Sequence, residues 1–226
     1  MKYIEDFQIS PVWDSELAIR GRQIIYNEIW VNHEYSRFAV EVKEGDIVVD
    51  CGANVGMFSQ YAIHKGASKV FSYECGDEEY KYLQMNTADT NKIITKQAYV
   101  SDVDYNIKKI LEENNLDFID FLKIDIEGSE FPLLINEDFE TLKKVKKIAI
   151  EFHIFGKFNG VTEYYDKMLY VFERLSLCGF KLNLEHMQID RFQKELYHVN
   201  TCMQQQGYII DGPYSTYQNQ RGINMM

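Results

Sequence analysis

The sequence predicts an α/β fold in which a doubly wound, mostly parallel sheet carries helices on both faces. Short apolar runs rich in β-branched residues, such as Ile47–Val49, alternate along the chain with longer segments of helical periodicity. Acidic or polar residues follow most of these runs, where parallel strands would reach the ligand-binding rim of an open sheet. An alternating order of strand and helix implies right-handed crossovers, and these make the sheet parallel.

The expected elements follow one another with short connections. We predict seven strands, the last two of which form an antiparallel edge pair. Their ranges are 47–49, 69–73, 93–100, 118–126, 147–153, 180–184 and 207–210. The apolar spacing predicts helices over 34–42, 57–65, 77–88, 107–113 and 162–178, and another that Ser129 caps. Between 15 and 30 the apolar spacing is uneven and favours neither helix nor strand.

The 226 residues suit a single domain. We expect residues 1–40 to form a lead-in segment that covers the core or part of the site. Residues 41–211 would form the α/β core, and the polar stretch 212–226 a loose tail.

Composition excludes several classes of protein. Hydrophobic residues make up 46% of the chain, enough for a sizeable core. The net charge of −11 argues against nucleic-acid binding, which requires a basic face. The four cysteines form no C-x-x-C pair, which indicates free thiols in a reducing compartment. There is no apolar leader and no run of membrane-spanning length, so we expect a cytoplasmic protein without a membrane span.

A glycine-containing loop follows the first predicted strand and places Asp50, Gly52, Asn54 and Gly56 at alternate positions. Glycine lets a backbone approach a ligand and adopt positive φ, and asparagine tolerates the same geometry. Asn54 stands where a dinucleotide-binding loop would have its second glycine. Asp50 at the strand end suits an ammonium group, so a ligand with an amino-acid part fits this loop better than NAD does. A plain tight turn is the alternative interpretation.

Two further acids lie where a nucleoside would be bound. Glu74 ends the second strand, 24 positions after Asp50. A carboxylate in that position typically accepts hydrogen bonds from both ribose hydroxyls. Asp102, just past the third strand, is a candidate acceptor for an adenine amino group, although acids are common in polar loops.

The fourth predicted strand runs into Asp125 and Glu127, and the fifth ends with Glu151 and His153. Acidic side chains at the end of a buried strand serve no packing purpose, so we treat these residues as a candidate reaction site. Glu127 could instead bond backbone amides, and His153 could be a satisfied structural residue. Glu130 is interpreted only as an acid at a helix start.

These motifs resemble those of the class I S-adenosylmethionine-dependent methyltransferases, and more narrowly the FkbM family. The resemblance rests on three stretches in the expected order, 48–59, 120–130 and 148–153. It implies a seven-stranded Rossmann-like sheet and O-methylation of a hydroxyl on a sugar, a glycan or a small natural product. It also implies that the Asp50–Gly56 loop and Glu74 bind the cofactor, and that Asp125 and Glu127 lie at the active-site rim.

Methyl transfer from a sulfonium depends mainly on holding the reactants in line, and a hydroxyl acceptor also benefits from a base. The candidate bases are Asp125, Glu127 and His153. Asp125 is favoured by position and His153 by its intrinsic pKa. Asp125, Glu127 and Glu151 could gather Mg²⁺, but the spacing does not establish a site, and we expect no metal.

Two other functions remain open from the sequence. One is an NAD-dependent oxidoreductase or epimerase, which would need a third loop glycine and a Tyr-x-x-x-Lys base. The other is a non-catalytic domain that binds the cofactor without using it. The expected partner of an active enzyme is a small-molecule or glycan acceptor.

Overall fold

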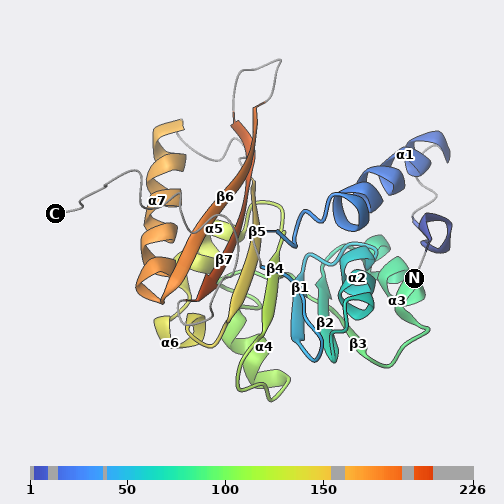
Figure 1. The fold of residues 1–226 in the computed structure, drawn as a ribbon, viewed down its shortest axis with the longest axis horizontal. Coiled ribbons are helices and arrows are strands. Elements are labelled where there is room, and N and C mark those ends of the chain that lie inside the picture. The colour runs from blue at the N-terminus through green and yellow to red at the C-terminus, as the bar shows by residue number, and fades with distance from the viewer. Residues whose placement is uncertain (1–2, 10–14, 38–39, 154–160, 190–195, 206–226) are drawn as a thin grey trace.

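Seven strands form one sheet in the computed structural model, which describes residues 3–9, 15–37, 40–153, 161–189 and 196–205. The spatial order of the strands is β3-β2-β1-β4-β5-β7-β6 (Figure 1). The strands are β1 (Ile47–Cys51), β2 (Lys69–Glu74), β3 (Ile93–Gln97), β4 (Phe121–Ile124), β5 (Lys147–His153), β6 (Phe180–Ile189) and β7 (Leu196–Gln205). β1 to β5 pair in parallel, which confirms the predicted α/β sheet, and β7 pairs antiparallel to β5 and β6.

Helices cover both faces of this sheet. They are α1 (Ser15–Tyr26), α2 (Met57–His64), α3 (Asp77–Thr87), α4 (Ile107–Glu113), α5 (Glu130–Asn136), α6 (Phe139–Leu142) and α7 (Val161–Leu177). The 3-10 turn η1 (Ile4–Asp6) precedes α1, and the π-helical turn η2 (Asn27–Val31) follows it. Figure 1 shows α1, α2 and α3 gathered at the β3 end of the sheet, and α5, α6 and α7 at the β6 end.

Alternating side chains of the strands divide the core into two layers. Val48, Val70 and Phe121 face the layer formed with α2 and the N-terminal segment. Val49 and Leu122 face the layer formed with α4, α5 and α7. All five are almost fully buried, which explains why the strands read as continuous apolar runs in the sequence. The two layers clamp the sheet and fix the position of its carboxyl edge.

The helix expected over 34–42 was wrong, and some strands have other bounds than expected. The stretch 34–42 forms no helix over its described residues, and the helical segment lies earlier, from α1 into η2. The last strand within the described residues is β7, and the strand expected over 207–210 lies outside them. β7 enters the sheet between β5 and β6, so the last pair is a hairpin whose second strand is internal. Regular apolar spacing in 34–42 did not suffice to form a helix.

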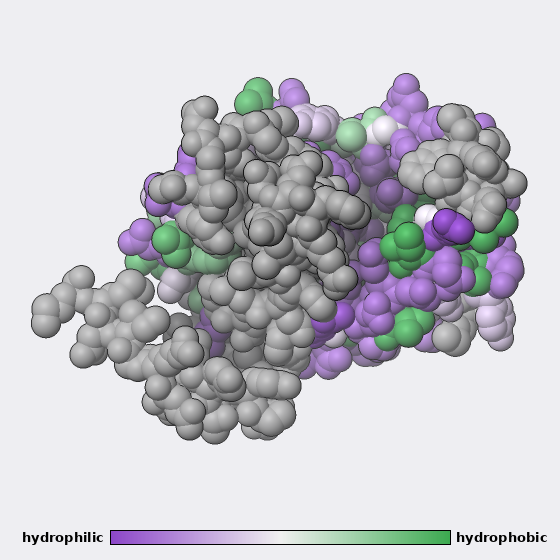
Figure 2. All heavy atoms as spheres, turned by 90° about the horizontal axis from the view of Figure 1, so that it is seen from above, coloured by the Kyte–Doolittle hydropathy of each residue, from purple (hydrophilic) through white to green (hydrophobic). Residues whose placement is uncertain are grey.

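Hydrophilic side chains cover most of the described surface seen from above in Figure 2, with separate hydrophobic groups between them. None of the helices within the described ranges is both long enough and apolar enough to cross a membrane.

Candidate active site

The carboxyl edge of the sheet brings together residues from three strands. Cys51 pairs with Ile124, and Ile124 pairs with Ile150, so the residues that follow them leave the sheet side by side. Gly52 follows β1 with φ +76°, and a Cβ placed on it would lie 1.7 Å from the carbonyl oxygen of Asp125. Only glycine fits this approach. The loops after β1 and β4 are therefore packed directly against each other.

Glu74 organises the loop that the sequence assigns to the cofactor. Its Oε2 accepts from the backbone N–H of Asn54 at 2.8 Å, and its Oε1 accepts from Cys75 and Gly76, also at 2.8 Å. Asn54 adopts φ +49° and Gly56 adopts φ +89° before α2 begins. A carboxylate has about four lone-pair sites. Three are filled, so Glu74 can still accept from a ribose hydroxyl beside the loop.

Asp50 is placed differently from the sequence-based expectation. Its side chain has no exposed surface, and its Oδ2 accepts from the Ser59 hydroxyl at 2.6 Å. Its Oδ1 lies 3.3 Å from the Lys123 ammonium. A direct contact with a ligand's ammonium group therefore does not agree with this position. Asp50 instead holds Lys123.

Lys123 joins the cofactor loop to the candidate reaction site. Its Nζ lies 3.3 Å from Asp125 Oδ2 and donates to the carbonyl oxygen of Gly52 at 2.7 Å. Burial opposes its charge, but the negative charges of Asp125 and Asp50 outweigh that effect and raise its pKa. Lys123 therefore stays protonated, and one buried cation is shared by two carboxylates.

The turn after Asp125 is held by Glu130, which the sequence analysis treated only as a helix-start acid. Its fully buried carboxylate accepts from the backbone N–H of Ile126 and of Gly128 at 3.0–3.1 Å. This bracing accommodates Glu127 at φ +51° and Gly128 at φ +99°. Glu127 is consequently turned outward, with 72% of its side chain exposed at the rim.

His153 lies at the centre of the acidic edge. Its Nδ1 donates to Glu130 at 3.0 Å, and its Nε2 lies 3.5 Å from Glu151 and 3.8 Å from Asp125. Burial favours the neutral ring, but the hydrogen bond to Glu130 and the surrounding negative charges raise the pKa of His153 to about 9. An imidazolium cannot accept a proton, so His153 is a poor general base at neutral pH.

The carboxylates around His153 differ in their tendency to ionise. Burial and the charge of Asp125 raise the pKa of Glu151 to about 7, against the opposing charge of His153. Partial burial of its carboxyl group also raises the pKa of Glu127, although most of the side chain is exposed. Asp125 is the carboxylate beside Lys123, and it receives a hydrogen bond from Tyr35 at 3.0 Å. These contacts fix the orientation of the Asp125 carboxyl group at the edge of the sheet.

Asp125, Glu127 and His153 offer ligand-type atoms within 4.8 Å of one another, and Glu151 is not part of that group. The Lys123 ammonium already supplies a positive charge 3.3 Å from Asp125, and His153 is itself cationic. Both charges repel a further cation, so this group fits a metal ion less well than its geometry alone suggests.

Asp102 is only partly available for the role that the sequence suggested. Its Oδ2 accepts from the Asn136 amide at 2.6 Å, which ties the loop after β3 to the end of α5. Ser129 does not cap α5 with its side chain, and its hydroxyl instead contacts the Tyr99 hydroxyl at 2.6 Å. Asp102 lies away from the cluster around His153 and shares no described contact with it.

Three participants in the site were missed or undervalued from the sequence: Tyr35, Lys123 and Glu130. Tyr35 lies in the N-terminal segment, outside every motif. A signal for Lys123 was present, because a lysine inside an otherwise apolar strand needs a buried counter-ion. Glu130 gave no such signal, since acids are common in the first turn of a helix.

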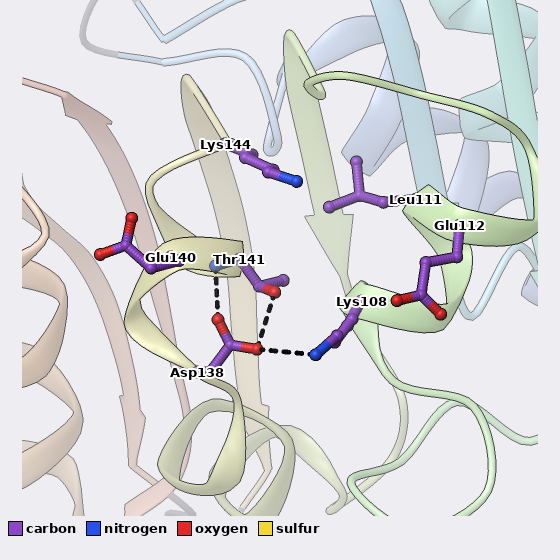
Figure 3. A pocket seen from close by; sticks show the side chains of 7 residues that line it. All are labelled: Lys108, Leu111, Glu112, Asp138, Glu140, Thr141 and Lys144. Carbon is purple, nitrogen blue, oxygen red and sulfur yellow. Dashed lines mark hydrogen bonds and ion pairs between the residues drawn. The ribbon is translucent and has the colours of Figure 1, made fainter.

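A cavity of about 170 Å³ lies between α4 and α6, and Figure 3 shows that charged side chains dominate its wall. Its lining includes Lys108, which lies 3.7 Å from Asp138. Its lining contains none of the candidate reaction-site residues Asp125, Glu127, Glu151 and His153. We therefore do not connect this cavity with the chemistry.

Comparison with known proteins identifies the family. The model of the methyltransferase FkbM domain matches residues 26–210, which is most of the chain. The chain belongs to the FkbM methyltransferase family. The 31-O-demethyl-FK506 methyltransferase FkbM of Streptomyces tacrolimicus is 38% identical over 66 residues. That match covers 28% of this chain and 25% of the relative's length.

Solved structures share the fold of this FkbM domain. A methyltransferase FkbM from Methylobacillus flagellatus superimposes with a TM-score of 0.53 at 19% identity, covering 88% of this chain and 56% of that one. A protein described as an S-adenosylmethionine-dependent methyltransferase from Listeria monocytogenes superimposes with a TM-score of 0.54 at 13% identity. That match covers 80% of this chain and 99% of the other. Both likenesses show the α/β methyltransferase fold.

Proposed function

We propose that this FkbM domain binds S-adenosylmethionine at the carboxyl edge of the sheet and methylates a hydroxyl group of a sugar, a glycan or a small natural product. The observation that carries the proposal is the contact between Gly52 and the Asp125 backbone. It supports the proposal because the loop that we assign to the cofactor and the carboxylate that we assign as the base are then neighbours. In-line displacement requires this proximity.

The residues present fit the cofactor. Glu74 is anchored by three backbone amides and keeps capacity to accept from ribose hydroxyls. Gly56 leaves the backbone open at the start of α2. Asp102 is our proposed acceptor for the adenine amino group, through the oxygen that Asn136 does not use. When bound, S-adenosylmethionine supplies an electrophilic methyl group.

In this proposal Asp125 accepts the proton of the acceptor hydroxyl as the new O–C bond forms. The Lys123 ammonium and His153 Nε2 lie 3.3 Å and 3.8 Å from the oxygens of the Asp125 carboxyl group. Glu127, exposed at the rim, accepts from neighbouring hydroxyls of the acceptor. A rim of carboxylates suits a neutral, hydroxyl-rich molecule, because each carboxylate accepts several hydrogen bonds, and it disfavours a phosphate-rich one.

Calorimetric titration tests the cofactor part of the proposal. S-adenosylmethionine and S-adenosylhomocysteine should bind the full chain, whereas NAD should not. Glu74→Gln should lower the affinity for S-adenosylhomocysteine about tenfold, because an amide cannot accept from two hydroxyls as a carboxylate does. Glu140→Gln, an exposed change on α6, is the matched control and should bind normally. If S-adenosylhomocysteine does not bind the wild-type chain, the proposal is wrong.

Transfer of a labelled methyl group tests the reaction. The acceptor panel would contain free monosaccharides, oligosaccharides and hydroxyl-bearing macrolides. We expect Asp125→Asn to bind S-adenosylhomocysteine normally and to lower turnover about 10²- to 10⁴-fold, which is the range for a lost general base. Normal turnover by Asp125→Asn would remove Asp125 from that role. Binding without transfer to any acceptor would favour the non-catalytic alternative.

A further inference from the structure

Glu130, the first residue of α5, is an acid without any exposed surface. Burying a carboxylate is costly unless hydrogen bonds replace the water that it loses. The first turn of a helix does not by itself require such burial, because an acid there can interact with the helix dipole from the surface. The partners of Glu130 therefore indicate what its burial achieves, and they lie on two elements of the candidate reaction site.

The first partners belong to the turn between β4 and α5. The carboxylate accepts from the backbone N–H of Ile126 at 3.1 Å and from that of Gly128 at 3.0–3.1 Å. Between these two amides lies Glu127, whose φ of +51° is unfavourable for a residue with a Cβ. Glu130 holds the backbone in this conformation. It thereby fixes the direction in which the Glu127 side chain leaves the turn towards the rim.

The second partner is His153 at the end of β5, whose Nδ1 lies 3.0 Å from Glu130 Oε1. Both carboxylate oxygens already face amide donors, so the carboxylate is the acceptor in this contact and Nδ1 supplies the hydrogen. Holding Nδ1 fixes the plane of the ring and the direction of Nε2. Nε2 then lies 3.6 Å from Glu127 and 3.8 Å from Asp125, at the edge where we place the acceptor.

We propose that Glu130 is a positioning residue that holds His153 and the Glu127 turn together as one preformed acceptor-binding edge beside Asp125. Glu130 is too deeply buried to touch the acceptor, and it acts through the side chains that it orients. Polar groups that are held in place before binding lose less freedom when a ligand arrives. This role rests on the proposed methyl transfer, whereas the bond between Glu130 and His153 can be tested without it.

A purely structural brace is the alternative, and Glu137 offers the matched comparison. It is also a buried acid, and it accepts from the backbone N–H groups of Ile107 and Lys108 at 2.8 Å and 3.2 Å. These amides start α4 rather than the turn at the reaction site. Glu137→Gln therefore reports what the loss of a buried bracing carboxylate does to the fold alone.

NMR of the full chain with 15N-labelled histidine tests the contact without cofactor or acceptor. The Nδ1 of His153 should carry a slowly exchanging hydrogen, assigned by its absence in His153→Asn. In Glu130→Gln one neutral oxygen serves three donors, so this hydrogen bond weakens and its proton resonance should move upfield. Glu137→Gln should leave the resonance unchanged.

The same spectra can overturn the proposal. An unshifted resonance in Glu130→Gln would show that Glu130 does not hold the ring. A wild-type His153 without a hydrogen on Nδ1 would contradict the contact outright, and that measurement does not depend on whether Glu130→Gln folds.

Transfer of a labelled methyl group separates positioning from bracing. With the best acceptor among the monosaccharides, oligosaccharides and macrolides, Glu130→Gln should lower kcat/KM for the acceptor about 10²-fold and bind S-adenosylhomocysteine normally. Glu137→Gln should lose stability in urea but keep kcat/KM. Added to His153→Asn, Glu130→Gln should cost less than it costs alone, because part of its effect passes through His153. Full additivity, or an equal loss of kcat/KM in Glu137→Gln, would overturn the proposal.

The two proposals can fail separately. Absence of S-adenosylhomocysteine binding to the wild-type chain would contradict the proposed function, whereas NMR of the unliganded chain would still report the bond between Glu130 and His153. Normal methyl transfer by Glu130→Gln would leave the function intact and remove Glu130 from the positioning role.

Discussion

Single side chains of this site serve two loops at once, and Lys123 is the clearest case. It lies on β4 and bonds Asp50 at the end of β1, the backbone of the cofactor loop and Asp125. A buried ion pair is a weak source of net stability, but removing one partner leaves an uncompensated buried charge. Lys123 therefore couples the integrity of the loop at Gly52 to the position of the Asp125 carboxyl group.

Replacing Lys123 by methionine tests this coupling. The side chain keeps its approximate length, but Asp50 and Asp125 lose their shared cation. We expect a loss of about 3–5 kcal/mol in the free energy of unfolding, measured by urea denaturation. The matched control is Lys143→Met, which removes the exposed partner of Glu140 on α6 and should change stability little. Equal effects of the two variants would contradict the assignment of Lys123.

At the scale of elements, the loops after β1 and β4 act as one unit, because Gly52 packs on the Asp125 carbonyl group. Gly52→Ala should displace that loop, lower stability by more than the strain of positive φ alone, and weaken S-adenosylhomocysteine binding at least tenfold. Gly45→Ala is the control. Its φ of +86° imposes strain of about 1–2 kcal/mol, but no atom lies within 4 Å of the new Cβ, so binding should be normal. Calorimetry and urea denaturation measure both effects.

Much of the element order was predictable from the sequence because buried parallel strands and amphipathic helices leave strong local patterns. The range of α4 was predicted without error, and Glu74 and Asp125 lie at the ends of their strands as expected. Contacts across the sheet were not predictable, since they depend on register. The meeting of Tyr35 with Asp125 and Glu151 joins residues 90 and 116 positions apart, and no local pattern encodes it.

The burial of Asp50 could not be predicted from the sequence either. A carboxylate at a strand end fits a ligand contact and a buried ion pair equally well. Its partners Ser59 and Lys123 lie on two other elements, α2 and β4. Only the packing of both elements against β1 decides between these alternatives.

At the scale of the whole molecule, several raised pKa values act in the same direction on stability. Those of Glu28 and Glu151 rise from 4.5 to about 7 and that of His153 from 6.5 to about 9. A group with a raised folded-state pKa stabilises the fold below its unfolded pKa and loses that contribution as the pH rises through the folded value. The stabilising contribution of the two glutamates is lost as the pH rises from about 4.5 to 7, and that of His153 as it rises from about 6.5 to 9.

Thermal unfolding as a function of pH tests the combined effect of these three groups on stability. The Tm should be highest near pH 5 and fall towards pH 9 by on the order of 5 °C or more. The net charge of −11 at pH 7 adds to the decline, because self-repulsion grows as further protons are lost. Glu151→Gln should flatten the part of the curve between pH 5 and 7. A Tm that rises from pH 5 to pH 9 would contradict these ionisation states.

The position of β7 between β5 and β6 has a consequence for the order of synthesis. β5 carries Glu151 and His153, but its neighbour β7 is translated about 50 residues later, after α7 and β6. At roughly 5–20 residues per second, β5 remains an open sheet edge for several seconds on the ribosome. Open apolar edges invite pairing with other chains, and charged side chains on them discourage it. Glu151 and His153 lie on this strand, which stays a sheet edge until β7 pairs with it.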